Sequence, residues 1–202
     1  MSFKFELYFA DTETTGLDDL KNEIIELSIY RLSDDSQRTW CLKPSKYDTI
    51  QPDALRVNGH KLEDLKHATK FGEETYLPPA KVIPDIENWF LGDGAAPEDR
   101  ILIGQNPRFD LGFLQKLWKQ ENAMETFPFG NRPFTVDTRE LCLFLDLAFG
   151  TRSQYYNLGS LVEKYKVKKL KAHRAAEDTI MTRDVFLAQL KIVQDMIQHK
   201  ED

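Results

Sequence analysis

Two acidic residues, Asp11 and Glu13, lie two positions apart at the end of an apolar stretch near the N-terminus. The odd positions from Phe3 to Phe9 predict one buried face of a β-strand, and the strand period of two carries both carboxylates onto that face. Burying two unpaired carboxylates costs roughly several kcal/mol per ion, so such a pair needs a metal ion, a basic partner or protonation. No Lys or Arg lies between positions 6 and 21, which favours a cation. The alternative is that the strand ends by Ala10 and that residues 11–16 form a solvated turn.

Two further acids interrupt apolar patterns in distant segments. Asp110 begins a predicted helix after the apolar run 101–103, and it shares a helical stripe with Phe113 and Leu117. In the helix predicted over 175–198, the apolar stripe followed backward from Met181 reaches Asp178. We therefore expect both acids to face inward. The alternative for Asp110 is a first-turn aspartate that only favours the helix dipole.

A histidine, His173, lies five residues before Asp178. On a regular helix the two side chains would be about 140° apart, so we expect His173 on the loop that leads into the helix. A single histidine there is usually a surface or capping residue. Four inward acids and one histidine from three separate segments are less easily explained by chance.

These residues resemble the three ordered motifs of the DEDDh 3′-to-5′ exonucleases, the DnaQ-like family of the ribonuclease-H-like superfamily. The motifs here are Asp11-x-Glu13 followed by Thr-Thr-Gly, then Asn106-x-x-Phe109-Asp110, then His173-x-x-x-x-Asp178. The sister branch has a Tyr four residues before the last Asp, where this chain has Arg174, so the histidine branch is implied. The resemblance implies an α/β fold with a ribonuclease-H-like five-stranded mixed sheet flanked by helices.

The resemblance also implies the chemistry of the site. Asp11, Glu13, Asp110 and Asp178 would be catalytic ligands of two divalent cations, Mg²⁺ or Mn²⁺, which prefer oxygen ligands. Two such ions serve phosphodiester hydrolysis by activating water and by stabilising the transition state and the leaving oxygen. His173 would be the general base, because a neutral imidazole accepts a proton from water near neutral pH.

In the family, residues after the first motif line the pocket of the terminal nucleotide. The resemblance therefore implies that Thr14, Thr15 and Leu17 bind substrate. It implies the same for Asn58, which lies where relatives often carry a nucleotide-contacting loop, and for Asn106 and Phe109 of the second motif. The expected activity is release of nucleoside monophosphates from 3′ ends of single-stranded or frayed DNA. RNA 3′ ends are an alternative substrate, and a proofreading-type subunit or binding module that acts with a polymerase or another repair or replication partner is an alternative role.

The formal net charge of −6 argues weakly against a protein that coats nucleic acid, because phosphate contacts are usually made by clustered Lys and Arg. Residues 164–174, however, contain six basic residues and no acid, and they lead into the third motif. We expect this basic run to contact backbone phosphates, with a solvated face as the alternative.

A length of 202 residues and a hydrophobic content of 41% suit one exonuclease domain over 1–202. Cys41 and Cys142 show no metal-ligand spacing and are expected to be reduced, packed thiols. No membrane segment or secretion signal is apparent, so we expect a cytoplasmic protein.

The expected elements alternate between strands and helices. Strands are predicted over 3–10, 24–32, 38–42, 101–103 and 134–136, and helices over 62–67, 79–91, a segment beginning near Asp110, 138–149, 158–165 and 175–198.

Overall fold

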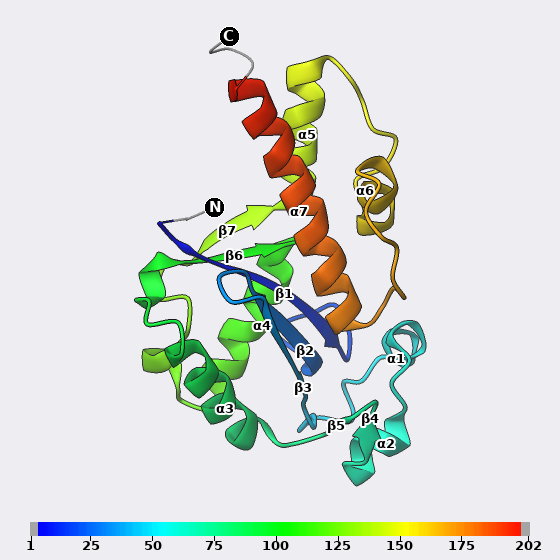
Figure 1. The fold of residues 1–202 in the computed structure, drawn as a ribbon. Helices are drawn as coiled ribbons and strands as arrows, with labels where there is room; N and C mark the ends of the chain where they lie inside the picture. The colour runs from blue at the N-terminus through cyan, green and yellow to red at the C-terminus, as the bar shows by residue number, and fades with distance from the viewer. Residues whose placement is uncertain (1–3, 199–202) are drawn as a thin grey trace.

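The computed structural model describes residues 4–198. Its main sheet has five strands in the order β3-β2-β1-β6-β7 (Figure 1). β1 is antiparallel to β2, which is antiparallel to β3, whereas β6 is parallel to both β1 and β7. The predicted mixed five-stranded sheet is therefore confirmed. The strands are β1 Glu6–Thr14, β2 Ile24–Arg31, β3 Ser36–Cys41, β6 Arg100–Gly104 and β7 Phe134–Asp137.

The helices flank this sheet, and a two-stranded hairpin lies beside it. The helices are α1 Pro52–Asn58, α2 Leu62–His67, α3 Pro79–Leu91, α4 Pro107–Gln120, α5 Thr138–Phe149, α6 Leu158–Lys164 and α7 Ala175–Gln198, with short 3₁₀ turns at Pro97–Asp99 and Met124–Thr126. The hairpin pairs β4 Lys70–Phe71 with β5 Glu74–Thr75. The sequence analysis missed α1 and this hairpin, because α1 buries only Leu55 and Asn58 and so shows no apolar period.

The two faces of β1 pack against different helices. Tyr8 and Ala10 lie in the core cluster that also holds the buried side chains of α3 and α4. Leu7 and Phe9, on the other face, pack in a cluster with Phe186 of α7. In Figure 1, α7 crosses the sheet on one side together with α5 and α6, whereas α3 and α4 lie on the other side. Odd positions of β1 therefore face α7.

β1 is longer than the strand expected to end at Ala10. Its pairing with β2 continues through Asp11, opposite Ser28, and Glu13, opposite Glu26. The alternative of a solvated turn over 11–16 is therefore wrong for the acidic pair. At the other end, the expected start of the strand at Phe3 lies outside the described residues.

Other expectations concerned the cysteines and membrane segments. Cys41 and Cys142 are both free and buried, as expected for packed thiols. Within residues 4–198, no helix combines the length and the apolar character needed to cross a membrane.

Candidate functional site

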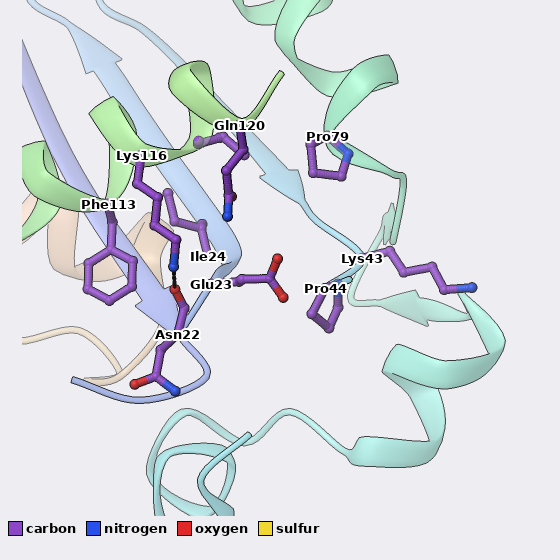
Figure 2. Close-up of a pocket in the computed structure, with 10 residues that line it drawn as sticks. Asn22, Glu23, Ile24, Lys43, Pro44, Pro79, Phe113, Lys116 and Gln120 are labelled. Carbon is purple, nitrogen blue, oxygen red and sulfur yellow. Dashed lines mark hydrogen bonds between the residues drawn. The ribbon is translucent and has the colours of Figure 1, made fainter. Parts of the chain in front are cut away.

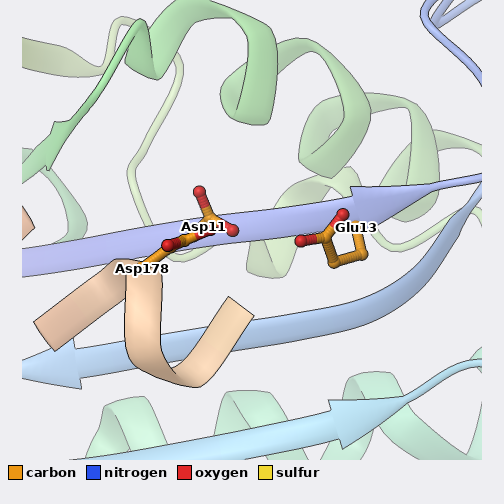
Figure 3. A group of neighbouring side chains, drawn as sticks. All are labelled: Asp11, Glu13 and Asp178. Carbon is orange, nitrogen blue, oxygen red and sulfur yellow. The ribbon is translucent and has the colours of Figure 1, made fainter. Parts of the chain in front are cut away.

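Three of the predicted acids come together in space. Ligand oxygens of Asp11, Glu13 and Asp178 all lie within 4.8 Å of one another. Figure 3 shows the first two projecting from β1 and the third from the first turn of α7. This meeting follows from strand period and helix packing, because odd positions of β1 face the helix that carries Asp178. The structure thus joins residues 165 positions or more apart in the chain into one acidic cluster.

The donor set of this cluster fits a divalent cation. All three groups offer carboxylate oxygens, which suit Mg²⁺ or Mn²⁺. Asp178 Oδ2 accepts a hydrogen bond from the His173 backbone N–H at 3.0 Å, but the buried Asp178 Oδ1 has no hydrogen-bond partner among residues 4–198. An unpaired buried carboxylate oxygen is costly, and a cation bound in the cluster would remove that cost.

Asp110 lies in the first turn of α4 and is 4% exposed, as its helical stripe predicted. Its Oδ1 accepts hydrogen bonds from Thr12 N at 2.9 Å and from Thr12 Oγ1 at 2.8 Å. It is therefore fixed against the strand that carries the acidic pair, but it does not belong to the group of three within 4.8 Å. Its role as a metal ligand stays a prediction.

The carboxyl groups of the site hold their protons more tightly than isolated ones. Burial, reinforced by mutual repulsion, raises the pKa of Asp11 well above its ordinary value and that of Glu13 to about 8. Burial raises the pKa of Asp178 to about 6, and that of Asp110 to about 7 despite the hydrogen bonds from Thr12. The metal-free site therefore resists full ionisation at neutral pH.

These shifts predict how the stability of the metal-free protein depends on pH. Acids with a folded pKa above the unfolded value bind more protons in the folded state, so the free energy of unfolding falls as pH rises. The loss begins near the unfolded pKa of about 4, and the part that Glu13 contributes is complete above its folded pKa of about 8. Melting temperatures in EDTA should therefore fall across this window, and Mn²⁺ should raise them more at pH 8 than at pH 5.

Asp178→Asn is the internal control for this prediction, because it removes one buried titrating group at nearly constant volume. In EDTA the variant should gain stability over the wild type as pH rises from about 4 to about 6, and the gain should level off above that pH. A difference between the two proteins that does not change with pH would contradict the prediction.

His173 lies on the loop just before α7, as predicted from its spacing to Asp178. Its side chain is exposed and its backbone has a φ of 63°, in the left-handed region. The hydrogen bond from its N–H to Asp178 Oδ2 ties this backbone to a member of the acidic cluster. The structure therefore places the backbone of His173 beside the acids and leaves its side chain accessible, and its role as general base stays a prediction.

The turn after Glu13 contains three expected substrate contacts. Thr14 donates a hydrogen bond from Oγ1 to the Gly16 carbonyl at 2.6 Å, and the fully buried Thr15 accepts one at Oγ1 from Glu23 N at 2.9 Å. Both threonine side chains thus build the turn itself. Leu17, in contrast, is 79% exposed and is the apolar side chain that the turn presents to solvent. Contact of these residues with a nucleotide stays a prediction.

Asn58 is only 3% exposed. Its Nδ2 donates to the Thr14 carbonyl at 3.2 Å, and its Oδ1 accepts a hydrogen bond from His60 N at 3.2 Å. Its side-chain groups are therefore used to hold the end of β1, and a direct contact with substrate stays a prediction.

Asn106 and Phe109 both precede Asp110 at the start of α4. Asn106 adopts a φ of 66°, and its Oδ1 accepts a hydrogen bond from Arg139 at 2.7 Å. Phe109 is half-buried, with its ring centroid 4.9 Å from that of Phe113. Both residues lie near Asp110 in the chain. Their contacts with substrate also stay predictions.

Two of the six basic residues of 164–174 are paired with acids of the fold, and contact of the run with phosphate stays a prediction. Lys164 forms an ion pair with the buried Asp146. The Arg174 side chain is 26% exposed and turns toward the buried Glu26. Buried acids elsewhere in the fold attract these two cations, which the local charge pattern did not reveal. The remaining lysines of the run are exposed.

The sequence analysis missed Glu26, which is 1% exposed and pairs in register with Glu13. Its Oε2 lies 3.3 Å from His60 Nε2, and the other nitrogen of that ring contacts the Tyr76 hydroxyl. The signal was available, because Glu26 is the one charged residue in the largely apolar run of Ile24–Tyr30. The histidine and tyrosine partners have no comparable signal in the sequence.

A separate pocket lies where β2 meets α4. Figure 2 shows Lys116 donating a hydrogen bond to the Asn22 carbonyl at 2.5 Å inside it. Its cavity volume of about 10 Å³ admits about one water molecule. This pocket is therefore too small to bind a nucleotide.

Comparison with known proteins identifies related sequences and folds. A protein-family model described as "RNase_T: Exonuclease" matches residues 8–186. A similar curated protein is the PolC-type DNA polymerase III of Thermotoga petrophila, which is 30% identical over 181 residues. The match covers 88% of this chain but 11% of the polymerase. The chain thus spans about a ninth of the length of this relative.

Solved structures share the fold at low sequence identity. Cell-death related nuclease 4 (CRN-4) matches with a TM-score of 0.72 and 17% identity, over 94% of this chain and 65% of that one. The zinc-bound form of the Escherichia coli ExoI complex with single-stranded DNA matches with a TM-score of 0.71 and 15% identity, over 95% of this chain and 41% of that one. Both similarities confirm the predicted ribonuclease-H-like architecture.

Proposed function

The chain belongs to the exonuclease family whose model matches residues 8–186, and on that premise we propose that it removes nucleotides from 3′ ends of single-stranded or frayed DNA. The observation that carries the proposal is the cluster of Asp11, Glu13 and Asp178 beside the exposed His173. We assign residues 1–202 to one exonuclease domain, since the family model extends over most of their length.

The residues of the chain have distinct roles in the proposed reaction. Asp11, Glu13 and Asp178 would hold two divalent cations, Mg²⁺ or Mn²⁺, with Asp110 as a further ligand. When bound, such ions supply charge stabilisation and lower the pKa of water at the site. His173 accepts the proton of the attacking water, and its exposed position allows it to release that proton to solvent.

The residues around the acids support a nucleic-acid 3′ end as the substrate. The exposed Leu17 next to the turn offers an apolar surface for a terminal base, and the exposed lysines within 164–174 offer charge for backbone phosphate. Neither surface distinguishes base sequence, which suits an enzyme that recognises an end. The PolC-type relative and the single-stranded DNA in the similar ExoI structure support DNA, and RNA is the second candidate substrate.

The match to part of a PolC-type polymerase also supports a role beside a replication or repair polymerase. We propose a polymerase as a partner of this chain. Co-purification with a polymerase, followed by gel filtration of the mixture, would test that association independently of catalysis.

The test of the proposed function is degradation of an oligonucleotide labelled at its 5′ end. With Mg²⁺ or Mn²⁺, a single-stranded DNA should shorten in single-nucleotide steps, with nucleoside monophosphates as products. Degradation should stop in EDTA and resume when the metal is restored, because the acidic cluster alone supplies no Lewis acid. An RNA of the same sequence, run in parallel, decides between the two substrates. Unchanged degradation after complete chelation would contradict the proposal.

A further inference from the structure

The side chain of Arg174 is only 26% exposed although it directly follows the exposed His173. Its Nε lies 3.7 Å from Glu26 Oε1, and its guanidinium carbon lies 4.4 Å from the centroid of the Phe71 ring. The Nε atom is buried and has no hydrogen-bond partner in the described part of the chain, so the contact with the carboxylate is an ion pair rather than a hydrogen bond. Arg174 is thus held between a buried acid of the sheet and the face of an aromatic ring in the β4–β5 hairpin.

Glu26 is a firm anchor for this side chain. It is 1% exposed and lies on β2, with both neighbouring strands paired to it. Its second oxygen lies 3.3 Å from His60 Nε2, and the His60 ring stacks on Phe71 with centroids 3.7 Å apart. The acid, the two rings and the guanidinium therefore form one packed group, which ordinary side-chain rotation does not dismantle.

The backbone of Arg174 connects this group to the loop of His173. The Arg174 carbonyl accepts the hydrogen bond from Asp178 N at 2.9 Å that begins α7. On the other side, the N–H of His173 donates to Asp178 Oδ2, and the left-handed backbone of His173 bends the chain between the two contacts. The position of His173 thus depends on the next residue, Arg174, whose side chain is held by Glu26 and Phe71.

We infer that Arg174 is a positioning residue, anchored by Glu26 and Phe71, that holds the His173 loop against the acidic cluster. The inference rests on the proposed function, since it assumes that His173 takes the proton of the attacking water. Without the contacts of Arg174 with Glu26 and Phe71, the His173 loop moves more freely. The imidazole is then less often close enough to the attacking water to accept its proton.

Arg174→Met tests the inference, because it keeps the unbranched packing on Phe71 and removes the charge that pairs with Glu26. Its kcat on single-stranded DNA should fall about 10- to 100-fold, the usual effect of losing an outer partner of a catalytic group. KM should stay close to that of the wild type. Glu26→Gln, of the same shape, should lower kcat in the same way. Arg56→Met, which removes an exposed arginine that is 76% accessible on α1, is the control and should leave kcat unchanged.

The double variant His173→Ala/Arg174→Met separates positioning from other roles. If Arg174 acts through His173, the double variant should be no slower than His173→Ala alone. If the double variant instead loses kcat by the product of the two single losses, Arg174 acts independently of His173 and the inference is wrong. The inference is also wrong if Arg174→Met raises KM and leaves kcat unchanged, because that result indicates direct contact with substrate. Should Arg174→Met fail to fold, Glu26→Gln with His173→Ala completes the same cycle. A fully active His173→Ala would instead refute the proposed general base, so the two failures are distinct.

Discussion

Asp11→Asn is expected to lower kcat for 3′-end degradation by about 10³- to 10⁴-fold, equivalent to losing several kcal/mol of charge stabilisation. Asp11 lies on β1 within 4.8 Å of the ligand oxygens of Glu13 and Asp178, so an amide in its place weakens cation binding by the whole cluster. Isothermal titration with Mn²⁺ should show the weaker binding in the same variant. Both effects arise from one lost negative charge.

Stability distinguishes this loss from unfolding. The pKa of Asp11 is raised well above its ordinary value by burial and by the neighbouring acids, so the ionised group destabilises the metal-free fold. In EDTA at pH 8, Asp11→Asn should therefore melt at a higher temperature than the wild type while remaining inactive. Asp53→Asn is the matched control, because that side chain is 88% exposed on α1. Wild-type activity in Asp11→Asn would exclude the acidic cluster as the catalytic centre.

His173→Ala is expected to lower kcat by about 10²- to 10⁴-fold, the range usual for loss of a general base. The side chain is exposed and no predicted metal ligand is removed, so the melting temperature and Mn²⁺ affinity should stay unchanged. The pH profile of the rate should differ between the wild type and the variant, because the group that accepts the proton of the attacking water is gone. Added imidazole should restore part of the activity, because the exposed loop leaves room for a small base.

His67→Ala is the control for this substitution. That imidazole is 70% exposed and lies on α2 beside Glu63, outside the three motifs. Its removal should change neither kcat nor the pH profile. If both alanine variants keep the wild-type profile, the proton is taken by a group other than His173.

Regular patterns made much of the fold predictable. The period of two placed Asp11 and Glu13 on one face of β1, and the helical stripe placed Asp110 inside the core at 4% exposure. Such patterns are local, because a strand or helix buries a fixed face whatever it packs against. The hairpin of Lys70–Phe71 and Glu74–Thr75 carries no such pattern, since two residues per strand are too few to show a period.

The partners of two basic residues could not be predicted from the neighbouring sequence. Arg174 belongs to a basic run in the sequence, yet its side chain lies with Glu26, a residue 148 positions earlier on β2. Lys164 likewise pairs with Asp146, a buried acid of α5. Which acid each of these two cations pairs with depends on the tertiary fold, and spacing along the chain does not reveal it.

By itself, the sequence determined which residues could do chemistry: the types, order and spacing of the acids and of His173 are properties of the chain alone. Only the tertiary structure decided that Asp178 meets Asp11 and Glu13 while Asp110 binds Thr12 on the neighbouring position of β1. It also decided that Glu26, His60 and Phe71 surround Arg174. The physical reason is that periodicity fixes the face on which a side chain lies, whereas its partners depend on packing between segments far apart in the chain.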